Sequence, residues 1–185
     1  METFLKIVGL VAIAIAVYTS WENTTKPDPN NRKYETGYNS TSTVTTEEES
    51  PYIDNRLQTG SVPYRNEKYG GSGSVVVVST SSRSECDVVV IIKHNGYIVR
   101  NAYIAAGDSY KFYVPNGIYQ VFFYGGKGWS PYKQMAGGQA GGFVANESYS
   151  KDSEVSLDYQ ELSYELIPQA NGNFSTQQSS ASEMF

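Results

Sequence analysis

Residues 87–104, Asp-Val-Val-Val-Ile-Ile-Lys-His-Asn-Gly-Tyr-Ile-Val-Arg-Asn-Ala-Tyr-Ile, decide the fold. The segment 87–93 is apolar at successive positions, which indicates a central strand that is covered on both faces. Asn95-Gly96 follows, and this dipeptide between strands is the strongest short signal for a hairpin because both turn positions need a positive φ. Residues 97–104 are then the returning strand.

Further strand patterns flank this hairpin. A β-branched run precedes it at 74–80, and polar and apolar residues alternate after it in four more segments, at 109–114, 118–124, 155–159 and 162–166. Pro115-Asn116-Gly117 marks a tight turn between the first two of these. Seven such strands, with turn signals between them and no convincing soluble helix, predict an all-β fold built as a single antiparallel β-sandwich of about seven strands.

Two stretches of this region, 99–109 and 114–121, resemble the strand-turn-strand core of prealbumin-like sandwiches, such as the regulatory domains of carboxypeptidases. A Pro-Gly-x-Tyr-x-Val-like turn plays the part there that Pro115 to Val121 play here. The resemblance implies a prealbumin-like, Greek-key arrangement of the strands.

A longer pattern covers most of residues 57–185 and resembles envelope-associated proteins of Bacteroidetes-type bacteria that are themselves uncharacterised. This likeness implies an accessory or binding role and supplies no catalytic residue. Its pieces are residues 59–60, 63–64, 124–131, 141–143, 150–152, 163–166 and 172–174.

The N-terminal segment connects the protein with a membrane. Residues 7–18 are apolar without a break, a length that fits the apolar region of a signal peptide better than a full span. Counting 4–21 gives a span if Lys6 snorkels and Trp21 lies at the interface. An uncleaved helical anchor and a signal peptide cleaved after Ala16, both within 1–21, therefore stay open, with a buried soluble helix as the third reading.

Composition divides the rest of the chain. Residues 22–73 are dominated by Asn, Thr, Ser, Glu, Gly and Pro, which predicts a disordered polar linker because little apolar surface offsets the entropy of ordering. Residues 74–176 form the expected sandwich domain, and 177–185 are expected to be a flexible tail. The predicted organisation is an anchor, a tether and a folded head.

Charge and rare residues exclude several classes of protein. A net charge of -5 argues against a nucleic-acid partner. One Cys and one His are too few for an internal disulfide or a protein-only zinc site, so neither a metal nor a cofactor is expected. A Ser-His-Asp or Cys-His mechanism would have to use His94, whose neighbours in sequence, Ser84, Cys86 and Asp87, stand a strand away. No enzymatic activity is expected.

The candidate contact surface is a Gly-rich segment, 125–142, which is longer than an ordinary hairpin loop. Exposed aromatic residues beside mobile backbone suit sugar stacking or a protein contact. The alternative is that Trp129 folds back and caps one end of the sandwich. The candidate binding residues are Tyr124, Lys127, Trp129, Tyr132 and Lys133.

These features predict a non-enzymatic, membrane-tethered protein of the cell envelope whose head binds another envelope protein or a glycan. The head is expected in the periplasm on an inner-membrane anchor, or at the surface after secretion; three cations in 26–33 leave a cytoplasmic orientation open. A second reading is a structural subunit of a surface fibre, appendage or secretion assembly, a homo-oligomer joined through exposed strand edges. The weakest reading is a glycan hydrolase, which needs two facing carboxylates.

Overall fold

The apolar run at 87–93 forms β3 (Asp87–His94), whose first six residues are all buried. β3 lies between β4 (Tyr97–Ile104) and β6 (Gly117–Gln134) in the larger of two sheets. Asn95 and Gly96 have φ values of 51° and 80°, so the hairpin turn between β3 and β4 is confirmed. The expectation of a central strand covered on both faces is confirmed as well.

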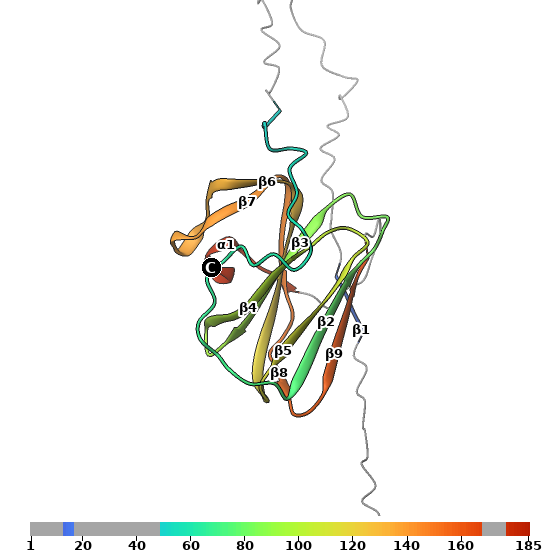
Figure 1. Cartoon of the computed structure of the whole chain (residues 1–185), viewed down its shortest axis with the longest axis vertical. Coiled ribbons are helices and arrows are strands. Elements are labelled where there is room, and N and C mark those ends of the chain that lie inside the picture. Colours follow the sequence, from blue (N-terminus) through green and yellow to red (C-terminus); the bar gives the residue numbers. More distant parts are fainter. Residues whose placement is uncertain (1–12, 17–48, 168–176) are drawn as a thin grey trace, which may run out of the picture.

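The computed structural model describes residues 13–16, 49–167 and 177–185, and these form an all-β sandwich of two sheets (Figure 1). The larger sheet has the order β10-β7-β6-β3-β4, with β8 paired to β6, and the smaller has the order β1-β9-β2-β5. The remaining elements are β1 (Ile13–Ala16), β2 (Ser74–Thr80), β5 (Ser109–Val114), η1 (Ala136–Gly138), β7 (Ala140–Lys151), β8 (Val155–Leu157), β9 (Glu161–Leu166), β10 (Gln177–Gln178) and α1 (Ala181–Met184).

Each of the seven predicted strands overlaps one of β2 to β6, β8 and β9, although β6 extends well beyond the predicted 118–124. β1, β7 and β10 are additional, so the expected count is not confirmed. The purely antiparallel arrangement is wrong: β2 pairs antiparallel with β5 but parallel with β9. The chain passes through the larger sheet between β2 and β9, and such a long crossover allows two strands to run in the same direction.

Two apolar cores hold the sandwich. The first lies between the sheets and contains side chains such as Val76, Val90, Phe123 and Tyr164. The second lies on the outer face of the larger sheet and contains Tyr64, Ile91, Tyr103, Phe122, Trp129, Phe143 and Met184, among others. The successive apolar residues of β3 thus serve both cores, because neighbouring side chains of a strand point to opposite faces.

The outer core is covered in part by residues 49–73, which were expected to belong to a disordered linker. They run along the larger sheet to the start of β2 (Figure 1). Tyr64 is only 2% exposed, and backbone hydrogen bonds join Gly60 and Ser61 to Tyr103 at the edge of β4. The linker prediction therefore does not hold for 49–73, because a few apolar side chains and an otherwise bare strand edge supply partners. Residues 22–48 lie outside the described residues.

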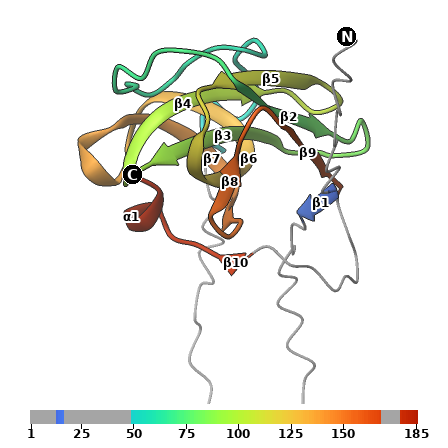
Figure 2. The same cartoon turned by 90° about the horizontal axis from the view of Figure 1, so that it is seen from below.

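The C-terminal residues also dock on the outer core, in contrast to the expected flexible tail. β10 pairs with the end of β7, and the short helix α1 follows it (Figure 2). The Met184 side chain is fully buried, and the Phe185 ring packs on Tyr64 with 4.8 Å between centroids. Met and Phe at the chain end thus supply apolar area that composition alone did not reveal.

Of the expected membrane segment 4–21, the structure describes only Ile13–Ala16, which form β1 and pair in parallel with β9. The predicted N-terminal helix is not confirmed. Among the residues that the structure describes, no helix is long and apolar enough to cross a membrane.

Candidate functional site

The Gly-rich segment 125–142 is a β-hairpin and not the long loop that was expected. β6 continues through it to Gln134, η1 makes the turn, and β7 returns along it. Register shifts between Gly125 and Lys127 and again after Ser130 mark bulges. Glycine is needed at Gly126, where a Cβ would overlap the Cβ of Phe143 on the paired strand.

Two of the predicted binding residues are buried within this hairpin. Trp129 is 3% exposed and Tyr124 is fully buried, and both rings pack against Phe143. In this conformation neither ring offers surface to a partner, which corrects their predicted role as contact anchors. The alternative, in which Trp129 folds back and is buried, is nearer to the structure, although its ring lies in the core on the outer face of the larger sheet.

Lys133, another of the predicted binding residues, is held by hydrogen bonds inside the hairpin. Its Nζ donates to the Phe143 carbonyl at 2.6 Å and to Glu147 Oε2 at 2.5 Å. Glu147 Oε1 accepts hydrogen bonds from the hydroxyls of Tyr124 at 2.5 Å and Tyr149 at 2.9 Å. Burial, followed by the hydrogen bond to Glu147, raises the pKa of Tyr124 well above its ordinary value. This cluster fixes the register of β6 and β7.

The other two predicted residues are exposed. Tyr132 is 73% exposed, and its ring meets that of Tyr52 at 6.1 Å between centroids. Lys127 lies in β6 directly after the first register shift and lines a cavity of about 360 Å³. The structure therefore divides the predicted site into a buried pair, a structural lysine and two side chains that can meet a ligand.

The cavity lies at the end of the sandwich where β3 begins. One wall is the segment around Ile53, and the other is the part of β6 at Lys127 and Gly128. The complete lining is Ile53, Asp54, Arg56, Ser82, Ser84, Glu85, Asp87, Ala106, Lys127 and Gly128.

Backbone contacts hold these two walls together. A side chain at Gly128 would collide with the backbone of Tyr52 and Ile53, and Gly128 has a φ of 69° that favours glycine. Trp129 N donates to the Asn55 carbonyl at 2.7 Å, and Asn55 Nδ2 donates to the Trp129 carbonyl at 2.5 Å. The two walls are thus one rigid unit, although they are more than seventy residues apart in sequence.

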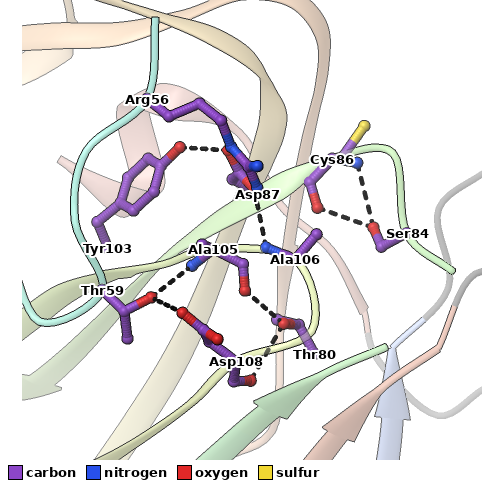
Figure 3. Close-up of polar contacts among 10 residues, drawn as sticks. All are labelled: Arg56, Thr59, Thr80, Ser84, Cys86, Asp87, Tyr103, Ala105, Ala106 and Asp108. Carbon is purple, nitrogen blue, oxygen red and sulfur yellow. Dashed lines mark hydrogen bonds and ion pairs between the residues drawn. The ribbon is translucent and has the colours of Figure 1, made fainter. Parts of the chain in front are cut away.

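Asp87, the first residue of β3, is the most buried polar residue of the cavity. Figure 3 shows the groups that surround its carboxylate. Its carboxylate accepts hydrogen bonds from Arg56 Nε at 2.7 Å and from the Ala106 backbone N at 2.8 Å, as well as from a second Arg56 nitrogen and the Tyr103 hydroxyl. A buried carboxylate needs such partners, since an unpaired one would be strongly destabilising.

The pKa values of this cluster follow from its contacts. Burial by itself would raise the pKa of Asp87, but hydrogen bonds from Arg56, Tyr103 and the Ala106 backbone outweigh it and lower the pKa. Burial, and then the bond to Asp87, raises the pKa of Tyr103 above its usual range. Burial also raises the pKa of the neighbouring Cys86 thiol. Asp87 is thus ionised at neutral pH, and Cys86 is a poor nucleophile.

The loop between β4 and β5, which carries Ala106, is fastened from two sides (Figure 3). Thr59 Oγ1 donates to Asp108 Oδ2 at 2.5 Å and accepts from Ala105 N at 3.0 Å. Thr80 Oγ1 lies 2.8 Å from the Ala105 carbonyl. The segment before β2 and the end of β2 thereby position this side of the cavity.

Several lining groups have no ion-pair partner among the described residues, namely Asp54, Glu85 and Lys127. Arg56 keeps about half of its side-chain surface exposed beside Asp87. The cavity therefore presents both hydrogen-bond donors and acceptors to a ligand.

Other candidate catalytic and metal groups are not assembled. His94 stands at the opposite end of β3 from Asp87, where it stacks on Tyr69 and its Nδ1 lies 2.8 Å from the Ile118 carbonyl. Two other acidic residues make structural contacts, as Asp152 accepts from the Tyr164 hydroxyl and Asp158 from Asn116. Within the described part of the chain, no group of three or more His, Cys, Asp or Glu side chains could hold a metal ion.

Sequence reasoning identified Lys127 but missed the other residues of the cavity. One local signal existed: Asp87 opens a strand that is otherwise apolar, and a charge in such a place calls for a partner. Nothing local identified Arg56 as that partner, because its segment has the composition of a linker. Contacts between distant segments, rather than a motif, create this cavity.

Comparison of the chain with known protein families, with curated proteins and with solved structures finds no match. The resemblance to prealbumin-like envelope proteins therefore stays a prediction.

Proposed function

We propose that this chain is a non-enzymatic, membrane-tethered protein of the bacterial cell envelope, whose sandwich head binds another envelope protein or a glycan. The observation that carries the proposal is the polar cavity between Arg56 and Lys127. Its two walls are held rigidly by backbone contacts, while charged groups on its rim lack ion-pair partners among the described residues. Rigid walls with unpaired polar groups suit ligand binding, because little entropy is lost when a ligand orders them.

The exposed Tyr132, with Tyr52 beside it, extends this surface. Tyr52 directly precedes the cavity residue Ile53, so the aromatic pair adjoins one wall. Exposed tyrosines supply contact area at low entropic cost in both glycan and protein recognition.

A non-enzymatic role is favoured by the state of Asp87. Its carboxylate is occupied by Arg56, Tyr103 and the Ala106 backbone, and its lowered pKa makes it a poor general acid. A hydrolase would have to use the exposed rim carboxylates of Asp54 and Glu85. Release of reducing sugar from an envelope glycan by the purified chain would contradict this part of the proposal.

The prealbumin-like, Greek-key arrangement is part of the same proposal. It is supported by the connections from β2 to β3 and from β5 to β6, which each pass from one sheet to the other. The turn at Pro115-Asn116-Gly117 makes the second of these.

The binding role can be tested with the full chain in intact cells. Protease accessibility before and after lysis fixes the side of the membrane on which the head lies. In-cell cross-linking then identifies the contacts of wild type, Lys127→Met and Tyr132→Ala. We expect each variant to lose a specific cross-linked species at unchanged expression.

Tyr97→Ala is the matched control, since Tyr97 is 65% exposed and lies at the far end of β3 from the cavity. A species lost equally in Tyr97→Ala, or retained in both Lys127→Met and Tyr132→Ala, would show that the contact surface lies elsewhere.

The second candidate function is that of a structural subunit of a surface fibre, appendage or secretion assembly. One observation on the smaller sheet favours it. The outer edge of β9 accepts a parallel strand, since Ile13–Ala16 pair with Ser163 to Leu166. If residues 4–21 are a membrane anchor or a removed signal peptide, this edge loses β1 and becomes a site for a strand from a neighbour.

Sedimentation of the protein purified from the cell envelope, over a range of concentrations, tests this candidate. Concentration-dependent polymers support a structural subunit. A monomer at every concentration contradicts it.

A further inference from the structure

The charged side chains around the cavity restrict the classes of ligand that it can bind. Two cationic side chains, Arg56 and Lys127, face it together with three acidic ones, Asp54, Glu85 and Asp87. A simple anion would meet the carboxylates, and a simple cation would meet the ammonium and guanidinium groups. The mixture of charges therefore disfavours small ions of either sign.

An apolar ligand also fits poorly. Only Ile53, Ala106 and Gly128 contribute an apolar lining, and none of the lining residues is aromatic. Little apolar surface could be buried there, so binding has to come from hydrogen bonds to charged and hydroxyl groups.

The polar groups around the cavity need a ligand that both donates and accepts. Carboxylates such as Glu85 accept only, whereas the Lys127 ammonium donates only, and Ser82 can do either. Neighbouring hydroxyls on one ring satisfy both kinds of partner and carry no charge. A volume of about 360 Å³ lies near the lower end of the range for ligand pockets, which leaves room for one or two sugar rings.

Resting on the binding function proposed above, we propose that the cavity between Arg56 and Lys127 binds an uncharged sugar residue of a glycan. The sugar hydroxyls donate to the rim carboxylates of Asp54 and Glu85 and accept from Lys127 and the exposed part of Arg56. Asp87 acts as a positioning residue, since its carboxylate is taken up by Arg56, Tyr103 and the Ala106 backbone and holds Arg56 at the cavity.

Three matched monosaccharides distinguish an uncharged sugar ligand from an anionic or a cationic one. Glucose, glucuronate and glucosamine share one ring but are neutral, anionic and cationic at mildly acidic pH. Binding of each to the full chain is measured by saturation-transfer NMR in a detergent without a sugar headgroup, with galactose, mannose and N-acetylglucosamine as further neutral probes. We expect dissociation constants of about millimolar for at least one neutral sugar and weaker binding of its charged counterparts.

Variants place the binding in the cavity. Lys127→Met and Glu85→Gln change exposed side chains, so the fold should persist, and each should weaken binding about tenfold through the loss of a charge-assisted hydrogen bond. Lys68→Met is the control, because Lys68 is exposed but does not line the cavity. Unchanged affinity in both cavity variants would overturn the assignment.

The remaining outcomes distinguish a failure of the sugar assignment from a failure of the proposed binding function. Stronger binding of glucuronate or glucosamine than of glucose would overturn the uncharged class. Absence of all sugar binding, while the Lys127-dependent cross-link in cells persists, would overturn the sugar and leave a protein partner in the same cavity. Absence of both would overturn the binding function itself.

Discussion

Asp87 shows how one residue links the stability of the sandwich to its cavity. A carboxylate at the first position of a buried strand is tolerated because Arg56, Tyr103 and the Ala106 backbone each donate to it. Asp87→Asn keeps the shape but removes the charge and leaves Arg56 without its partner. We expect a loss of about 2–3 kcal/mol in the free energy of unfolding, measured by urea denaturation. Glu85→Gln, a neighbouring exposed carboxylate, should change it by less than about 0.5 kcal/mol.

The contact between Asp87 and Arg56 predicts that the free energy of unfolding depends on pH. The folded-state pKa of Asp87 is lowered, so its stabilisation is fully present above the ordinary carboxyl pKa of 3.8 and is lost as the pH falls through the folded-state value. The difference in unfolding free energy between wild type and Asp87→Asn should therefore be constant at neutral pH and shrink below about pH 4. A difference that stays the same in acid would show that the ion pair is not its source.

Gly126 is one of the glycines at which the hairpin leaves no space for a side chain. A Cβ there would overlap the side chain of Phe143 on the paired strand, whereas a Cβ at Gly70 would meet nothing within 4 Å. Gly126→Ala should lower the free energy of unfolding by about 1–3 kcal/mol through overpacking. Gly70→Ala serves as the control and should be nearly neutral. Equal urea midpoints for the two variants would mean that the strands separate easily.

At the scale of elements, the β6–β7 hairpin places two aromatic residues in different surroundings, since Trp129 is buried and Tyr132 is exposed. Trp129→Ala removes a buried ring and should cost about 3–5 kcal/mol in unfolding free energy. Tyr132→Ala removes an exposed ring and should cost less than about 0.5 kcal/mol. Thermal denaturation followed by circular dichroism distinguishes them. A small effect of Trp129→Ala would reopen its predicted role as an exposed contact.

This hairpin also shows what the sequence could predict. Strands such as β3 and β5 carry their own pattern, because burial alternates or persists along a few consecutive residues. β7 was missed because its sequence, rich in Gly, Ser and polar residues, is stabilised by pairing with β6 and by the contacts of Glu147. The cavity was missed for a related reason, since Arg56 and Asp87 are 31 residues apart in sequence and no local pattern connects them.

At the scale of the whole molecule, the folded unit is larger than the sandwich that strand patterns delimit. The larger sheet has a second apolar face, and Tyr64 from the segment 49–73 and Met184 from the chain end cover it. A chain that begins at Ser74 would expose this face to water and also bare the edge of β4.

A pair of fragments tests this boundary. We expect residues 49–185 to unfold in one cooperative transition and to bind little of the dye ANS, because both cores are covered. Residues 74–185 should bind ANS and melt at least about 10 °C lower, since loss of the Tyr64 ring alone removes about 3 kcal/mol of apolar burial. Tyr64→Ala in the longer fragment should reproduce part of this shift. If the two fragments have the same melting temperature, the segment 49–73 adds nothing to the stability of the sandwich and is a passive tether. The cavity wall that contains Arg56 would then not be held against the sheets by these contacts.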